Sequence, residues 1–222
     1  NASISDTIIN VTFDITPPEF AIIKPINNSP VNSTELSYSI SEPISSGLIT
    51  WRAVGNGDTG SPHKREIIDE QKRGGTFRNF VFTEPPALVD GVKYNISIVG
   101  TDLAGNKGKE VSINNILYDI TPPEFVEIIP TSDSYINETN ISYTLTETLA
   151  EGKIFFENVG GTSDPKRTHV ITLAGSKKTE GQQGGKLPKS FVNLVSGAKY
   201  TIIFEGNDEA GNQAPETKVE NI

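Results

Sequence analysis

The heptapeptide Asp14-Ile-Thr-Pro-Pro-Glu-Phe20 recurs unchanged as Asp119-Ile-Thr-Pro-Pro-Glu-Phe125, 105 residues further along the chain. After one inserted residue near Thr162 the offset becomes 106, and it relates Asp102-Leu-Ala-Gly-Asn106 to Asp208-Glu-Ala-Gly-Asn212. Self-similarity at a fixed interval is the mark of a repeat architecture. Two copies of one unit therefore account for most of the chain.

The repeat predicts two domains, at residues 14–118 and 119–222. Residues 1–13 align with the end of a copy, because Ile8 falls over Ile113 and Val11 over Ile116. We expect residues 1–13 to be the final strand of a preceding repeat, or a strand donated to another molecule.

Apolar side chains alternate with polar ones within each copy, which is the period of a half-buried antiparallel strand. The alternating apolar positions are Leu36, Tyr38 and Ile40 in the first copy and Ile141, Tyr143 and Leu145 in the second. In the first copy we predict strands near 18–24, 34–41, 48–54, 63–69, 76–82, 92–101 and 110–118. The sequence thus predicts an all-β protein, built as two tandem immunoglobulin-like β-sandwiches of about seven strands each.

Aromatic residues recur at two positions of the unit. Tyr94 and Tyr200 begin the penultimate strand, where a tyrosine corner bonds its hydroxyl to upstream backbone. Trp51 and Phe156 share one position on the third strand and are predicted to fill the core between the sheets. The chain has no cysteine, so packing alone has to hold the sheets together.

These motifs resemble tandem bacterial Ig-like (Big) repeats. The Thr-Pro-Pro linker and the Asp-x-Ala-Gly-Asn hairpin carry the resemblance together with the Leu-x-x-Gly-x-x-Tyr corner, and the penultimate strand is also similar to fibronectin type III. The resemblance covers essentially the whole chain. It implies a stalk or adhesive segment of a large surface protein or filament.

The linker itself favours a stiff connection. Two prolines, Pro122 and Pro123, fix their own φ angles and push Thr121 towards extended geometry. A short extended connector limits bending between domains. The prolines are equally consistent with a protected edge strand.

Composition excludes several partners. The chain has 19 Lys+Arg and 28 Asp+Glu, a formal net charge of -9, whereas nucleic acid and anionic lipid reward basic patches. No apolar run approaches the length of about 20 residues that spans a bilayer, so we expect no membrane insertion. Abundant Asn, Ser and Thr are typical of an extracellular or cell-surface β-protein.

Calcium is the one cofactor that the sequence suggests. Carboxylate and amide oxygens are hard ligands suited to Ca²⁺, and the resemblance implies calcium at domain junctions. The candidate ligands are Asp14, Asp102, Asn106, Asp119, Asp208 and Asn212. The other interpretation is an Asx-type turn, in which the hairpin aspartates accept backbone N–H bonds while Gly105 and Gly211 adopt positive φ.

Sequons for N-glycosylation occur roughly twice as often as the composition predicts. They lie at Asn1, Asn10, Asn27, Asn32, Asn95, Asn137 and Asn140. Attached glycans would fit turns and outer faces of a secreted chain, but Asn, Ser and Thr are also ordinary turn residues. Both interpretations stay open.

Nothing in the sequence predicts an enzyme. His63 and His169 occupy one repeat position near the start of the fourth strand, and no triad can be assembled around them. Glu42 and Glu147 also repeat and are expected to cap a loop or pair with a lysine. The glycine-rich stretch 181–185 is expected in a hairpin-like loop rather than a phosphate loop.

The leading functional hypothesis is an extracellular structural or adhesive module that acts as a semi-rigid rod. One alternative is a self-assembling filament subunit joined by donation of the N-terminal strand. Another is a carbohydrate-binding accessory module, which requires an exposed aromatic platform. Expected partners are neighbouring repeats or copies of itself, and a cell-surface glycan or protein, with contacts in the variable stretches 55–76 and 160–187.

Overall fold

The computed structural model of the chain describes residues 12–186 and 192–222. Its described residues form two compact units, one of residues 12–29 and 33–118 and the other of residues 30–32, 119–186 and 192–222. We call these domain 1 and domain 2. Of the predicted N-terminal segment 1–13, all but its last two residues lie outside the described part. Among the described residues no helix has the length and apolarity needed to cross a membrane.

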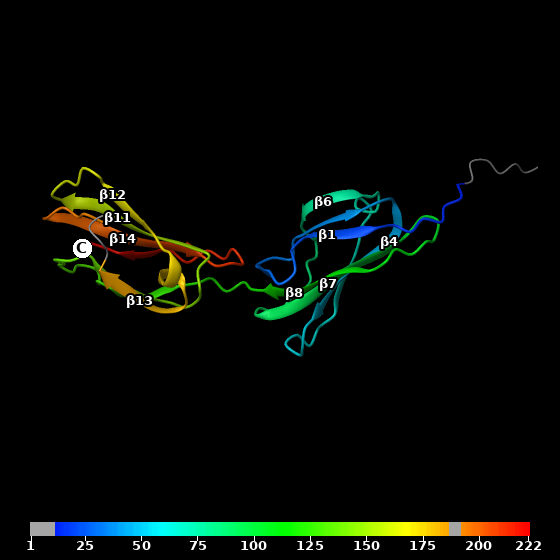
Figure 1. Cartoon of the computed structure of the whole chain (residues 1–222), viewed down its shortest axis with the longest axis horizontal. Helices are drawn as coiled ribbons and strands as arrows, with labels where there is room; N and C mark the ends of the chain where they lie inside the picture. The colour runs from blue at the N-terminus through cyan, green and yellow to red at the C-terminus, as the bar shows by residue number, and fades with distance from the viewer. Residues whose placement is uncertain (1–11, 187–191) are drawn as a thin grey trace, which may run out of the picture. The chain divides into compact units, whose positions relative to one another are not determined.

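Domain 1 is built from two layers of strands (Figure 1), and the short strand over residues 30–31 is described with it because it is bonded to the last strand of domain 1. One layer has the order β1 (Phe20–Lys24), β3 (Leu36–Ile40), β6 (Gly75–Phe80). The other has the order β2 (Pro30–Val31), β8 (Val111–Tyr118), β7 (Val92–Asp102), β4 (Ile44–Ala53), β5 (His63–Glu66). Non-consecutive strands are neighbours in both layers, as in an immunoglobulin-like sandwich.

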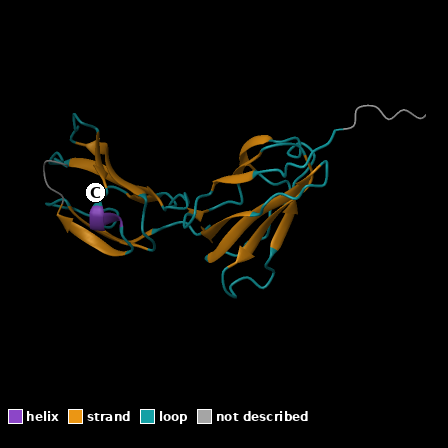
Figure 2. Cartoon of the chain, turned by 45° about the vertical axis from the view of Figure 1, so that its right-hand side comes forward, coloured by secondary structure: helices purple, strands orange, loops and turns teal. Residues whose placement is uncertain are grey.

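Domain 2 repeats this plan. One layer has the order β13 (Gly181–Lys186), β10 (Asn140–Leu145), β9 (Phe125–Ile129). The other has the order β12 (Thr168–Thr172), β11 (Glu151–Gly161), β14 (Ala198–Asn207), β15 (Thr217–Val219). A single 3-10 turn, η1 (Gly175–Lys178), is the helical element of the described residues (Figure 2). The predicted fold class is confirmed.

Alternation along the strands sets what each layer buries. On β7 the side chains of Tyr94, Ile96 and Ile98 are buried while those between them are half-buried. Trp51 and Phe156 are each 1% exposed, so both fill the sandwich core as predicted. Full burial of one large apolar side chain contributes roughly 1.5–3 kcal/mol. Trp51 packs edge-on against Phe82 with ring centroids 5.2 Å apart.

An asparagine pair joins the loop after β1 to strand β8. Asn28 and Asn115 both adopt left-handed φ angles, 62° and 58°, and their side chains are hydrogen-bonded. Asp133 and Asn221 repeat the arrangement in domain 2. Short polar side chains tolerate this backbone region better than most residues do. The same arrangement therefore closes both domains.

Backbone bonds extend this junction in domain 1. They run from Asn28 N–H to the Asn114 carbonyl, from Leu117 N–H to the Ser29 carbonyl and from Asp119 N–H to the Val31 carbonyl. The residue numbers rise together on the two segments, so the two run parallel. The segment that contains β2 thereby connects the start of the domain to its last strand.

The glycine-rich stretch 181–185 corrects one expectation. It was predicted to be a loop, but it belongs to β13, which pairs with β10 from Leu145↔Gly181 to Asn140↔Lys186. Glycine weakens a strand because it has no side chain to pack. As the edge strand of its sheet, β13 is held by backbone hydrogen bonds to one neighbour, β10, and these do not depend on side chains. Its glycine-rich composition therefore wrongly indicated a loop.

Candidate functional site

Three carboxylates meet in each domain. The trios are Asp14, Glu42 and Asp102 in domain 1 and Asp119, Glu147 and Asp208 in domain 2, and within each trio the oxygens lie within 4.8 Å of one another. In domain 1, Asp102 ends β7, Glu42 follows β3, and Asp14 precedes the Thr-Pro-Pro segment. Each carboxylate trio is thus assembled within one domain, from three segments far apart in sequence.

The hairpin turn expected at Asp102 is present. Asp102 Oδ1 accepts the Asn106 backbone N–H at 2.8 Å, and Gly105 adopts a φ of 96°. The Asn106 side-chain NH₂ donates to Asp102 Oδ2 at 2.8 Å and to the Asp14 carbonyl at 3.1 Å. The Asn212 side-chain NH₂ makes the equivalent bonds, to Asp208 Oδ2 at 2.8 Å and to the Asp119 carbonyl at 2.9 Å.

The candidate metal residues therefore come together, with one addition. In this arrangement the two asparagines act as hydrogen-bond donors that hold the aspartates, and Glu42 and Glu147 supply the third carboxylate of each trio. The sequence analysis assigned these glutamates to loop capping or lysine pairing. Their recurrence at one repeat position was the available signal, but a single repeated carboxylate does not indicate a partner.

The charges of the domain 1 trio act on one another. Burial raises the pKa of the Glu42 carboxyl, and the negative charges of Asp14 and Asp102 raise it further. Burial also opposes ionisation of Asp102, but hydrogen bonds from Asn106 and from the hairpin backbone outweigh it and lower the pKa of Asp102. Like charges at this separation repel, and a bound cation would relieve that repulsion.

A second repeated cluster is buried at the tyrosine corner. In domain 1 the Tyr94 hydroxyl donates to Asp58 Oδ2 at 2.6 Å and accepts the Val89 N–H at 2.9 Å. His63 Nε2 lies 2.6 Å from the same Asp58 oxygen. In domain 2 the corresponding network joins Tyr200, Val195, Asp164 and His169 over 2.7–2.9 Å. The tyrosine corner was predicted, whereas the aspartate was not.

Hydrogen bonds keep both aspartates ionised. Those from Tyr94 and then His63 lower the pKa of Asp58 to about 2, and those from His169 and then Tyr200 lower the pKa of Asp164 to about 2. Because an ionised carboxylate only accepts, Nε2 of each histidine carries the proton and donates. Burial, and then the bond to Asp58, raise the pKa of the Tyr94 hydroxyl to about 12.

In domain 2 the histidine–aspartate–tyrosine cluster is fully buried. Asp164 and His169 are each 3% exposed, and Tyr200 is 2% exposed. A substrate therefore has no access to these groups, and their polar atoms are satisfied by one another. The cluster fastens the loop before β12 to the start of β14, and its counterpart fastens the loop before β5 to the start of β7.

Comparison with known families agrees with the fold and the motifs. The sequence model of the bacterial Ig-like domain (group 3) matches residues 84–220, which is more than half of the chain. The chain belongs to the bacterial Ig-like domain family, group 3. The likeness to Big repeats noted in the sequence is thereby confirmed.

Three solved structures resemble this bacterial Ig-like chain. The FN1–FN3 domains of chicken CNTN1 are 10% identical, with a TM-score of 0.45, covering 92% of this chain and 66% of that one. The fibronectin(III)-like modules of Clostridium thermocellum CbhA are 12% identical, with a TM-score of 0.42 and coverages of 91% and 92%. A tetra-tandem repeat from the extending region of a large adhesion protein is 17% identical, with a TM-score of 0.34 and coverages of 92% and 48%.

The chain thus spans just under two thirds of the first of these three structures. No curated protein matches it.

The predicted glycosylation sites of the bacterial Ig-like domains differ in access. Asn1 and Asn10 lie outside the described residues. The side chains of Asn27, Asn32, Asn137 and Asn140 are exposed. Asn95 is half-buried, and its Oδ1 accepts the Asn115 N–H at 3.1 Å. Four of the five described sequons therefore present an exposed side chain, although Asn27 Oδ1 also accepts a hydrogen bond, from the Asn114 N–H at 2.6 Å.

Proposed function

We propose that this chain is a structural or adhesive module of an extracellular or cell-surface protein and that it acts as a semi-rigid spacer. The observation that carries the proposal is the repeat itself. Each copy begins with the same Thr-Pro-Pro segment and completes a domain with its own core. A module of this kind sets length and orientation rather than performing chemistry, and we assign it no catalytic role.

The connector supports the spacer role. Pro122 and Pro123 have fixed φ angles, and Asp119 Oδ1 accepts the Thr121 N–H at 3.2 Å. These features reduce the freedom of the short segment between two folded units, which is what limits bending.

Changing the linker prolines tests the spacer role directly. Dyes attached in each domain report the distribution of interdomain distances by single-molecule energy transfer. The variant P122G/P123G should broaden that distribution, whereas P85G/P86G, a Pro-Pro pair inside domain 1, should leave it unchanged. Equal widths for the wild type and P122G/P123G would contradict the proposal.

A second role, calcium binding, is supported by the carboxylate trios. Three carboxylates within 4.8 Å of one another recur in both domains, and carboxylates are the ligands that Ca²⁺ prefers. Asp102 and Asp208 would hold the ion from the hairpin, with Glu42 and Glu147 opposite and Asp14 and Asp119 from the linkers. Binding there would fasten each linker to its own domain.

The other two hypotheses receive less support. Donation of an N-terminal strand concerns residues 1–13, of which residues 1–11 lie outside the described part. A carbohydrate-binding accessory module was expected to use an exposed aromatic platform, but the single tryptophan, Trp51, is 1% exposed.

A further inference from the structure

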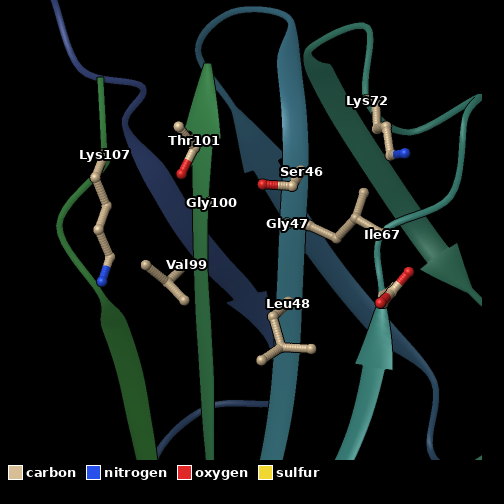
Figure 3. A pocket seen from close by; sticks show the side chains of 10 residues that line it. Ser46, Gly47, Leu48, Ile67, Lys72, Val99, Gly100, Thr101 and Lys107 are labelled. Atoms are coloured by element: carbon tan, nitrogen blue, oxygen red, sulfur yellow. The ribbon is translucent and has the colours of Figure 1, made fainter. Parts of the chain in front are cut away.

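Domain 1 has a surface depression whose residues domain 2 reproduces only in part: Lys72 corresponds to Lys178, but other lining residues differ. Its cavity volume is about 310 Å³, within the range of small-molecule sites, which begins at about 300 Å³. It lies on the outer face of the sheet, over neighbouring strands β4 and β7 and the segment after β5 (Figure 3). Leu48 and Val99, paired across β4 and β7, are its half-buried apolar centre.

Charged and hydroxyl groups surround this apolar pair. Lys72 and Lys107 lie on opposite sides of the strand pair in Figure 3. Ser46, Thr101 and Glu66 complete the polar lining. The Lys72 ammonium group makes one ion pair among the described residues, to Asp69 at 3.4 Å. The other four polar side chains have no hydrogen bond or ion pair with any described residue, so their bonding capacity is available to a ligand.

The repeat shows which of these features are particular to domain 1. The positions of Leu48 and Val99 carry Lys153 and Glu205 in domain 2, also paired across neighbouring strands. Lys107 corresponds to Gln213. Both Lys153 and Glu205 are exposed. The same backbone therefore accepts a charged pair at this point, and the fold does not require an apolar one.

The place of the depression decides what kind of ligand fits it. Strand β4 is bonded to β5 on one side and to β7 on the other. Its backbone cannot receive an added peptide strand there, so recognition has to use side chains. The lining offers an apolar floor, hydroxyls and a carboxylate for ligand hydroxyls, and two ammonium groups for an anion. This set fits a compact ring that carries both hydroxyls and a carboxylate.

We propose that this depression of domain 1 binds an acidic saccharide, with the carboxylate of a uronic acid unit between Lys72 and Lys107 and the sugar ring over Leu48 and Val99. Domain 2 lacks the site. The proposal is independent of the spacer role, because it concerns one face of one domain and not the linker.

Titration calorimetry with tetragalacturonate tests the proposal. The titration is done in EDTA, so that calcium held by the carboxylate trios cannot bind the ligand. The wild type should bind one equivalent, with a Kd of roughly 10 µM to 1 mM. The variant L48K/V99E, which installs the residues of domain 2, should weaken binding at least tenfold, and K107Q should weaken it severalfold. The exposed domain 2 variant K153A is the matched control and should bind as the wild type does.

Four outcomes would overturn the proposal. Two concern tetragalacturonate: the wild type does not bind it at millimolar concentration, or L48K/V99E binds it as tightly as the wild type does. The other two concern the wild type with other ligands: it binds neutral maltotetraose as tightly as tetragalacturonate, or it binds tetraglutamate as tightly, which would indicate an acidic peptide ligand. The melting temperature of each variant shows whether domain 1 is still folded. The linker variant P122G/P123G should bind normally, so failure of the spacer role and failure of this site are distinguishable.

Discussion

The hydroxyl of Tyr94 lies 2.6 Å from Oδ2 of Asp58, although the two residues are 36 positions apart in the chain. The same bond joins Tyr200 to Asp164 in domain 2, at 2.7 Å and the same separation of 36. A buried network of this kind is stabilising when every member is satisfied and costly when one partner is removed. It therefore makes both domains sensitive to acid and to small substitutions at the tyrosine.

Acid should destabilise both domains through these aspartates. The pKa of Asp58 and Asp164 is about 2 in the folded chain, below the ordinary value of 3.8. A lowered folded pKa contributes stability that is complete above the unfolded pKa and is lost as the pH falls through the folded pKa. We expect urea midpoints to fall between about pH 4 and pH 2.

The variant D58N isolates this effect in domain 1, because an amide does not titrate. Its urea midpoint, followed by Trp51 fluorescence, should be lower than the wild type at neutral pH and should change less between pH 4 and pH 2. D69N, at a side chain that is 99% exposed, is the control and should behave as the wild type. An equally steep fall in D58N would show that other groups cause the acid sensitivity.

Removing one hydroxyl should destabilise one domain. Y94F leaves the Val89 N–H without its acceptor and takes one hydrogen-bond donor from Asp58, which costs about 1–3 kcal/mol. Trp51 is the single tryptophan and lies in domain 1, so its fluorescence reports that domain. Y94F should lower the unfolding midpoint seen by Trp51, whereas Y200F should lower only the domain 2 transition seen by circular dichroism. Y135F, at a fully exposed tyrosine, should change neither.

The core position of Trp51 should tolerate phenylalanine. Domain 2 has Phe156 at this position, also 1% exposed. W51A leaves a large cavity and should cost about 3–5 kcal/mol. W51F keeps an aromatic ring against Phe82 and should cost clearly less. Urea unfolding followed by circular dichroism compares the two, and equal costs would mean that ring packing at this point is unimportant.

The ionised Glu42 side chain should lower the melting temperature of domain 1 in the absence of calcium, whereas bound calcium should raise it. Burial and the neighbouring aspartates raise the pKa of Glu42, so its ionised form is unfavourable in the folded chain. E42Q should raise the melting temperature of domain 1 in EDTA and should remove most of the increase that calcium gives the wild type. E35Q, at an exposed glutamate, should leave both values unchanged. A wild type whose melting temperature ignores calcium would contradict the calcium proposal.

The alternation of apolar residues was sufficient to predict most of the strands of domain 1 and the core, but not β2 or the glycine-rich strand β13. Tyr38, Tyr94 and Trp51 are all buried because period-two patterning places them on inner faces. Asp58 was missed because it lies in a loop, within the variable stretch, and its partners are 5 and 36 residues away. The residues around Asp58 do not indicate a contact with residues so far away. The only available signal was that an aspartate recurs at the equivalent position, Asp164.

The carboxylate trio was found only in part, for a related reason. Asp102 and Asn106 share a short motif, so their mutual bonds could be predicted from spacing. Glu42 follows β3, a strand of the other layer, and only the folded chain brings its carboxylate to Asp102. Nothing in the sequence around Glu42 indicates this contact. Likewise, the depression of domain 1 depends on Lys72 and Lys107 lying on either side of strands β4 and β7, and this arrangement is visible only in the folded chain.

The parallel pairing of the β2 segment with β8 has a mechanical consequence. A force that separates Asn28 from Asp119 acts on these two parallel segments in opposite directions along their length. The bonds from Asn28, Leu117 and Asp119 then carry the load together and have to break at once. A hairpin pulled at its open end would instead lose its bonds one after another. We therefore expect this pairing to resist such a force through several bonds loaded in parallel.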